Sequence, residues 1–326
     1  MPALYPYSYS DTLLRIDNVG LSASADGLRL LEKEEQGSRP ILKNVSAEVK
    51  KIERPDHIQG QVVGFIGPSG IGKTQLFRII AGLNTPTSGA VYVNHDTTPV
   101  QAGEVGVVAQ NYPLFAHRSV MGNLELAAGR KEKDSKVAHD KIMDFLNEFG
   151  LADKAHLYPE QLSGGQRQRI AIIQQILCSE HYLLMDEPFS GLDIIVEGKA
   201  TELIMKVANR DGLNTVIVVT HDISAAASIA DHIWALGRDF DVNGTPTPGL
   251  LIPSEQLATN GGQYQPLNGA TIVTTYDLIE GTRTDARGTK QIVEQGLCWS
   301  QIGDKAMVQP NMVEFIREVK SDFYHF

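Results

Sequence analysis

Three short stretches of this chain carry residue types suited to phosphate chemistry. The first, Gly67–Thr74, reads GPSGIGKT and fits the pattern G-x-x-x-x-G-K-[ST]. Its glycines let backbone N–H groups wrap a phosphate, the Lys73 ammonium supplies a point charge, and the Thr74 hydroxyl can ligate Mg²⁺. The nucleotide-binding residues expected in this stretch are Gly67, Pro68, Ser69, Gly70, Ile71, Gly72, Lys73 and Thr74.

The second stretch places two carboxylates at the end of an apolar run. Tyr182–Met185 is followed by Asp186 and Glu187. Asp186 is suited to hold Mg²⁺, often through water, and Glu187 to accept a proton from an attacking water. A strand that ends in Asp-Glu is more often a solvated loop, but its occurrence in one chain with Gly67–Thr74 favours the catalytic interpretation.

The third stretch, Leu162–Arg169, reads LSGGQRQR and precedes Ile170–Leu177, where apolar residues recur at helical spacing. A hydroxyl and two glycines before a helix expose backbone N–H groups at the positive end of the helix dipole. Such a cluster of exposed N–H groups, here called a phosphate nest, is also what Gly67–Thr74 offers. The second nest has no counterpart of Lys73. The sequence therefore raises the question of why one chain has two phosphate nests.

Short apolar, β-branched runs position these stretches. Val62–Ile66 stops at Gly67, and Tyr182–Met185 and Val216–Val219 likewise end in polar residues. Such runs are typical of buried parallel strands. The sequence therefore predicts an α/β domain with a mostly parallel sheet.

Between these strands, residues from about 112 to 178 are predicted to be rich in helix. Ile142, Phe145 and Phe149 recur at helical spacing, and Gly150 is placed to end that helix. We interpret the region as a helical subdomain inserted in the α/β core.

The two ends of the chain have other patterns. Leu13–Val19 and Val45–Val49 are predicted strands, and the polar Ser22–Pro40 between them is a loop or hairpin insertion. From Gly237 to about Gly269 the composition indicates a linker or extended loops. Met312–Phe323 has the spacing of a helix that docks on its own domain.

Composition bounds the class of protein. With 326 residues, 42% hydrophobic and 21% charged, the chain is predicted to be soluble and globular. A net charge of −10 argues against a general nucleic-acid binder. Two cysteines, Cys178 and Cys298, favour a reducing cytosolic setting. No run approaches the roughly 18 apolar residues that span a bilayer, so we expect any work at a membrane to go through a partner.

Together these motifs closely resemble the ATP-binding subunits of ABC transporters. Gln110 resembles the family's Q-loop, Leu162–Gln166 is identical to its signature, Ser190–Asp193 resembles its D-loop, and His221 matches its switch histidine. The motifs follow the family's order over about residues 13 to 237. The resemblance implies an ABC ATPase fold: a P-loop NTPase core with a mostly parallel sheet, an N-terminal antiparallel β subdomain and an inserted α-helical subdomain. Residues 1–237 would form the ATPase domain and 238–326 an extension of unclear role.

The resemblance also implies roles for single residues, with ATP and Mg²⁺ as cofactors. Glu187 would be the base for the attacking water, His221 a γ-phosphate contact, and Gln110 a contact to Mg²⁺ and water. The implied catalytic residues are Lys73, Gln110, Glu187 and His221, and the implied Mg²⁺ ligands are Thr74, Gln110 and Asp186.

In this family two nucleotide-binding domains face head to tail, which would explain the two nests. Each ATP lies between the phosphate loop of one domain and the signature of the other. Ser163, Gly164 and Gly165 would offer donors to the γ-phosphate of the partner's ATP, and Gln166 and Asp193 are further residues implied to bind the nucleotide.

The implied partners are a second copy of the chain or a homologous ATPase subunit, transmembrane permease subunits, and a solute-binding protein in the complete system. No direct contact with nucleic acid is expected. The protein would be cytoplasmic and peripheral on the inner face of the cell membrane. Asn111–Val120 resembles the stretch that abuts the membrane subunit, so Tyr112, Leu114 and Phe115 could form a docking patch or pack in the core.

An importer is favoured by analogy with bacterial uptake systems, and the solute is not encoded in any motif we recognise. An alternative is a soluble, non-transport ABC ATPase that acts on nucleic acid or ribosomes, although such proteins usually carry two cassettes or a long coiled coil. A nucleotide switch that does not hydrolyse ATP is a further alternative, against which Glu187 and His221 argue.

The chain departs from the family pattern where adenine binds. The family usually has an aromatic residue soon after the first strand, but Ser10–Gly64 contains no Phe, Trp or Tyr. An aliphatic residue or an aromatic from elsewhere would have to substitute. We therefore expect weaker or less base-selective nucleotide binding.

Overall fold

The structure is a computed structural model that describes residues 8–54, 57–58, 61–94, 97–179, 182–191, 194–208, 215–237, 269–278, 282–285 and 290–292. The linker expected between Gly237 and Gly269, the helix expected over Met312–Phe323, and Cys298 lie outside these residues.

Strands dominate the two ends of the described chain, and helices are concentrated in its middle. The strands are β1 Ser8–Ala23, β2 Leu30–Leu31, β3 Arg39–Arg54, β4 His57–Ile58, β5 Gln61–Ile66, β6 Ser88–Val93, β7 Gly106–Val108, β8 Tyr182–Asp186, β9 Thr215–Thr220, β10 His232–Gly237, β11 Thr271–Asp277, β12 Thr282–Asp285 and β13 Lys290–Ile292. The helices are α1 Lys73–Ile80, α2 Val120–Ala128, α3 Ser135–Glu148, α4 Gly164–Cys178, α5 Ile194–Ala208 and α6 Ile223–Ile229, with 3-10 turns at Ala152–Lys154 and Pro159–Gln161.

An antiparallel sheet contains the N-terminal strands, in the order β2-β1-β3-β4 with β6 also paired to β1. The strands predicted at Leu13–Val19 and Val45–Val49 are confirmed, and both are longer than expected because β1 and β3 pair along most of their 16 residues. Ser22 pairs with Pro40, so the intervening polar segment is a hairpin. The predicted antiparallel β subdomain is confirmed.

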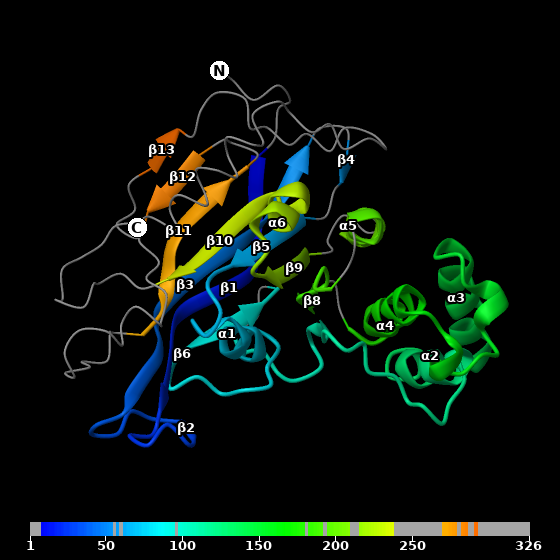
Figure 1. Ribbon diagram of the computed structural model, residues 1–326, viewed down its shortest axis with the longest axis horizontal. Coiled ribbons are helices and arrows are strands. Elements are labelled where there is room, and N and C mark those ends of the chain that lie inside the picture. Colours follow the sequence, from blue (N-terminus) through cyan, green and yellow to red (C-terminus); the bar gives the residue numbers. More distant parts are fainter. Residues whose placement is uncertain are drawn as a thin grey trace.

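The second sheet has the order β13-β12-β11-β10-β5-β9-β8-β7. β10, β5, β9, β8 and β7 pair in parallel, which confirms the predicted strands at Val62–Ile66, Tyr182–Met185 and Val216–Val219. Strands β11 to β13 continue the sheet in antiparallel fashion beyond β10 (Figure 1). The described part of the C-terminal extension thus completes the main sheet, while the domain boundary at residue 237 stays a prediction.

Both faces of this sheet are covered, which explains why its central strands read as unbroken apolar runs. Val216 and Val218 of β9 pack into a core that includes residues of α4, α5 and α6. Ile217 and Val219 point the other way, into a core shared with α1 and the antiparallel sheet. The sheet is therefore the middle layer of the domain.

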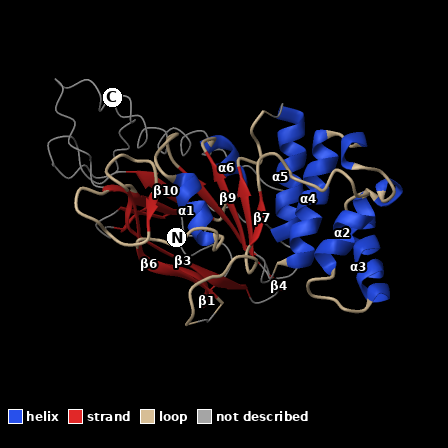
Figure 2. Cartoon of the chain, turned by 90° about the horizontal axis from the view of Figure 1, so that it is seen from below, coloured by secondary structure: helices blue, strands red, loops and turns tan. Residues whose placement is uncertain are grey.

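Helices α2, α3 and α4 form a group beside the sheet layers (Figure 2). In α3, Ile142 and Phe145 are fully or almost fully buried, Phe149 caps the helix, and Gly150 follows with a φ of 66°. The helix predicted from this spacing is confirmed. Within the described residues, none of the helices combines the length and the apolar character needed to cross a membrane.

Candidate functional site

The loop between β5 and α1 forms a cradle of backbone groups. Gly70 and Gly72 have φ values of 77° and 116°, which a residue with a side chain rarely adopts. A Cβ on Gly67 would lie 2.9 Å from the Leu236 carbonyl oxygen, so the loop must begin with glycine. A Cβ on Gly70 would meet no described atom within 4 Å, which shows that this side of the loop faces open space. The loop thus offers N–H groups and the first turn of α1 to an anion.

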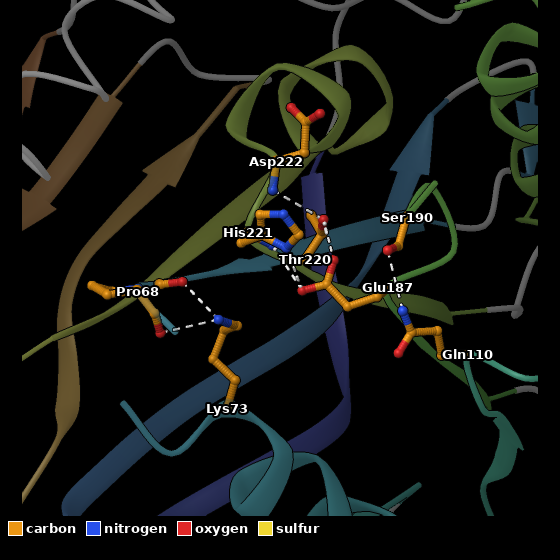
Figure 3. A network of polar contacts seen from close by, with 9 residues as sticks. Pro68, Lys73, Gln110, Glu187, Ser190, Thr220, His221 and Asp222 are labelled. Atoms are coloured by element: carbon orange, nitrogen blue, oxygen red, sulfur yellow. Dashed lines mark hydrogen bonds and ion pairs between the residues drawn. The ribbon is translucent and has the colours of Figure 1, made fainter. Parts of the chain in front are cut away.

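Lys73 is the first residue of α1 and is buried beneath this loop. Its Nζ donates to the carbonyl oxygens of Gly67, at 2.7 Å, and Pro68, at 3.1 Å (Figure 3). Burial lowers the pKa of Lys73, and the charges of Glu187 and Asp186 oppose that shift. The ammonium therefore lies in the loop and donates to neutral carbonyls, where an oxyanion would be a stronger acceptor.

The acid pair lies at the carboxyl end of β8. Burial, followed by the like charge of Glu187, raises the pKa of Asp186, and Lys73 opposes this. Glu187 has a φ of 48°, an uncommon conformation for a non-glycine residue, and its backbone N–H donates to the Val219 oxygen at 2.8 Å. The chain therefore turns sharply after Asp186, and the Val219 oxygen holds the Glu187 backbone at this turn.

The end of β9 supplies the hydrogen-bond donors for the Glu187 carboxylate. Oε2 accepts from Thr220 Oγ1 at 3.0 Å, and Oε1 accepts from the backbone N–H of His221 at 3.1 Å. His221 Nδ1 also lies 2.8 Å from Oε1 (Figure 3). The His221 side chain is 61% exposed and that of Glu187 only 17%. The imidazole therefore reaches solvent while the carboxylate is held inside.

Gln110 follows β7 and reaches the segment after β8. Its Nε2 donates to Ser190 Oγ at 3.1 Å. Tyr112 and Gln168 both donate to the Pro188 carbonyl oxygen, each at 3.3 Å. The loop after Glu187 is thus bonded to the Gln110 loop and to α4.

The second nest lies at the start of α4. Ser163 Oγ accepts from the Gln166 N–H at 3.3 Å, and Gln166 Oε1 accepts from the Ser163 N–H at 2.8 Å, forming a capping box. A Cβ on Gly164 or Gly165 would meet no described atom within 4 Å. Helix α4, which carries this nest, lies apart from α1 in both views (Figures 1 and 2).

Comparison with known proteins places this arrangement in a family. A family model described as ABC transporter matches residues 56–190. The taurine import ATP-binding protein TauB of Yersinia pestis bv. Antiqua (strain Antiqua) is 35% identical over 232 residues, which are 70% of this chain and 82% of that protein. The chain belongs to the ATP-binding subunits of ABC transporters.

Two further comparisons add to this. The sulfate/thiosulfate import ATP-binding protein CysA 2 of Rhizobium meliloti (strain 1021) is 32% identical over 222 residues, but the chain spans only 58% of its length. The dimeric structure of the ATP-binding cassette MJ0796 in a post-hydrolysis state, bound to ADP and Pi, aligns with a TM-score of 0.54 and 28% identity. That alignment covers 68% of this chain and 94% of the cassette. The predicted ABC ATPase fold, with its antiparallel sheet and mixed, mostly parallel sheet, is confirmed.

The residues proposed to hold Mg²⁺ in this ABC subunit offer suitable oxygen donors. Thr74 is exposed in the first turn of α1, Asp186 is half-buried at the end of β8, and Gln110 is exposed after β7. Mg²⁺ prefers hydroxyl, carboxylate and amide oxygens and keeps several waters. Burial, and after it the charge of Glu187, raises the pKa of Asp186, and a cation at this position would favour the charged form of both acids. The donor set therefore fits the ion, and in the described residues no cluster of three or more His, Cys, Asp and Glu competes with it.

The expected docking patch divides into a packed part and an exposed part. Tyr112 and Leu114 are partly buried against the core that contains α2 and α4. Phe115 is 46% exposed. Of the three side chains, Phe115 is the one that is exposed.

Some expectations from the sequence stay predictions. Asp193 lies outside the described residues, so its contact with a partner's ATP is untested. Ile41 and Leu42 of β3 lie beside the phosphate loop, where a Cβ on Gly72 would be 3.3 and 3.1 Å from their side-chain atoms. The expectation of weaker or less base-selective nucleotide binding stays a prediction.

Sequence reasoning missed Thr220 and Asn123. Thr220 stands directly before His221, and that adjacency was the available signal. Asn123 is fully buried and binds the backbone of Phe115, Arg118 and Ser119, which nothing in its sequence context indicates.

Proposed function

We propose that this chain is the ATP-hydrolysing subunit of a solute importer, that it works as a pair of ATPase subunits, and that it binds separate transmembrane subunits. One observation carries the proposal: Lys73, Glu187 and His221 gather at the carboxyl edge of β5, β8 and β9, while the Ser163 nest lies apart on α4. Each chain would therefore contribute one half to each of two sites.

Within one half, this chain's own residues bind the phosphates and prepare the water. Lys73 exchanges the carbonyl oxygens of Gly67 and Pro68 for β- and γ-phosphate oxygens. Glu187 accepts a proton from the attacking water, and His221 rotates from Glu187 toward the γ-phosphate. Mg²⁺, when bound, would neutralise developing negative charge on the phosphates.

Three residues of this half are suited to hold that ion: Thr74, Gln110 and Asp186. Gln110 is bonded to Ser190, in the segment that follows Glu187. If Gln110 bound Mg²⁺ instead of Ser190, the segment that follows the proposed base Glu187 would lose this hydrogen bond.

The other half would come from a second ATPase subunit. Ser163, Gly164, Gly165 and Gln166 present N–H and hydroxyl donors at an exposed helix N-terminus, without a lysine. Lys73 of the opposite chain would supply that charge. Asp193, in the same family arrangement, is proposed to contact the shared site. The dimeric neighbour bound to ADP and Pi supports this pairing.

Import is supported by the relatives, which are named as import ATP-binding proteins for sulfate/thiosulfate and taurine. The exposed Phe115 is proposed to contact a transmembrane subunit, which would hold the chain at the inner face of the membrane. A solute-binding protein would complete such a system.

The variant Glu187→Gln tests the catalytic part of the proposal. It should lower ATP turnover by about 10²-fold or more while the affinity for ATP stays within a few-fold of that of the wild type, because the amide cannot take the proton but keeps the shape. Steady-state hydrolysis and fluorescence-detected nucleotide binding measure the two effects. Turnover like that of the wild type would remove Glu187 from the role of base.

The same variant tests the transport part. Tagged Glu187→Gln protein should retain ATP and, in a pull-down from mildly solubilised membranes of its host, bring a polytopic membrane protein with it. Lys73→Ala protein, which should not bind the phosphates, is the control. Ribosomal or DNA-repair proteins without a membrane subunit would contradict the transport proposal and favour the non-transport ATPase.

A further inference from the structure

We infer that Thr220 is a positioning residue for Glu187, one that fixes the plane of the carboxylate for proton transfer. This inference rests on the proposed role of Glu187 as the base. Thr220 does not have to touch nucleotide or water in this role. It acts only through the carboxylate that it binds.

The hydrogen bonds of Thr220 determine where its proton points. Its Oγ1 accepts the backbone N–H of Asp222 at 3.1 Å and lies 3.0 Å from Glu187 Oε2. An ionised carboxylate only accepts hydrogen bonds, so the hydroxyl proton must go to Glu187. Thr220 is fully buried, so water does not compete for this charge-assisted bond.

Two fixed donors from the end of β9 bind the two carboxylate oxygens separately. Thr220 Oγ1 binds Oε2, and the His221 backbone N–H binds Oε1 at 3.1 Å. One is a backbone N–H, and the other is the hydroxyl of a buried side chain that also accepts the Asp222 N–H. A carboxylate held through both oxygens cannot rotate about its terminal bond. Without the Thr220 hydroxyl, the remaining fixed donor would allow that rotation.

The third contact of Glu187 is of a different kind. His221 Nδ1 lies 2.8 Å from Oε1, but the imidazole is 61% exposed and is free to turn toward a phosphate. When it turns, only the two fixed donors hold the carboxylate. Thr220 therefore matters most in the state that carries out hydrolysis.

The backbone of Glu187 makes such support necessary. Its φ of 48° is a strained conformation for a residue with a side chain, and its N–H is held by the Val219 oxygen at 2.8 Å. Three consecutive residues of the β9 end, Val219 to His221, thus bind Glu187. The strand orients both the backbone and the carboxylate of the proposed base.

The test compares Thr220→Val, which removes the hydroxyl at nearly constant shape, with Thr220→Ser, which retains it. Thr220→Val should lower kcat for ATP hydrolysis by about 10-fold to 100-fold with KM for ATP within about threefold of wild type, because nucleotide binding does not use this hydroxyl. Thr220→Ser should keep kcat within about threefold of wild type. If Thr220→Val does not fold, Thr220→Ala takes its place and should show the same loss of kcat.

The same strand offers a matched control. Thr215 of β9 is also fully buried, but its Oγ1 has no hydrogen-bond partner in the part of the chain that the structure describes. Thr215→Val should therefore leave kcat unchanged. If any Thr→Val substitution in β9 disturbed the site, Thr215→Val and Thr220→Val would both lower kcat.

Two results would overturn the inference. One is Thr220→Val, or Thr220→Ala in its place, with kcat close to wild type while Glu187→Gln is inactive; the proposed function would then stand without this role for Thr220. The other is Thr220→Ser with the same loss of kcat as Thr220→Val, which would assign the effect to packing. Full activity of Glu187→Gln would instead refute the proposed role of Glu187 itself.

Discussion

At the scale of single residues, the raised pKa of Asp186 predicts how the free energy of unfolding depends on pH. Burial and the Glu187 charge raise the pKa of Asp186 above its ordinary value of 3.8, with Lys73 opposing. The folded chain therefore binds more protons than the unfolded chain from about pH 4 up to the raised pKa, and the free energy of unfolding falls as pH rises through that window.

Asp186→Asn should remove this unfavourable contribution. At pH 7 the variant should unfold at a higher urea concentration than wild type, with the difference shrinking toward pH 4, while Mg²⁺-dependent hydrolysis falls. Asp153→Asn is the control, because a hydrogen bond from Lys154 lowers the pKa of that exposed acid and no gain is expected. A lower urea midpoint for Asp186→Asn at pH 7 would show that the attraction to Lys73 outweighs the cost of burying the Asp186 charge beside Glu187.

Residue spacing alone predicted Lys73, Thr74 and Glu187, because a phosphate loop and a strand-end acid are local patterns. It could not predict that Thr220 and the His221 N–H bind the Glu187 carboxylate, since those contacts join positions 33 and 34 residues apart across two strands. It also could not predict the left-handed backbone conformation of Glu187, because glycine is the usual sign of that conformation in a sequence and this position is not glycine.

At the scale of elements, Asn123 ties the start of α2 to the loop that precedes it. Its Oδ1 accepts from the Phe115 N–H at 2.8 Å, and its Nδ2 lies 2.9 Å from the Ser119 oxygen and 3.2 Å from those of Phe115 and Arg118. It is fully buried. This side chain therefore fixes the segment that presents Phe115.

Asn123→Ala should lower the free energy of unfolding by about 2 to 4 kcal/mol, because several backbone groups lose a buried side-chain partner at once. Urea denaturation measures the loss, and amide hydrogen exchange at residues 115 to 119 should rise. Ser119→Ala, which removes the side-chain cap of α2, should cost only about 1 kcal/mol. Equal losses in the two variants would contradict a special role for Asn123.

The apolar runs predicted the central strands and the helical group, because burial on both faces imposes a simple pattern on sequence. They did not predict β11, whose pairing with β10 depends on residues far away in the chain. Nor did they predict the full lengths of β1 and β3, which pair through several register shifts that break the alternation of buried and exposed residues.

At the scale of the whole molecule, the two predicted phosphate nests lie on different parts of the fold. The Gly67–Thr74 loop joins β5 to α1, whereas Ser163 caps the N-terminus of α4. Helix α4 belongs to the group of helices beside the sheet layers (Figure 2). The sequence predicted both nests, and family resemblance predicted that they meet only between two chains. Hydrolysis by this chain should therefore depend on ATP-driven pairing.

The most direct measurement is the molecular mass of Glu187→Gln protein in solution by light scattering, with and without ATP and Mg²⁺. A site shared between two chains predicts 35.6 kDa without nucleotide and twice that mass with it. Adding Gly165→Asp should abolish the doubling, because the new carboxylate has open space at the nest and would repel the partner's phosphate. Gly165→Asn, equal in shape but uncharged, is the control that should still pair. A mass that stays at 35.6 kDa with saturating ATP, or doubling that survives Gly165→Asp, would contradict the shared site.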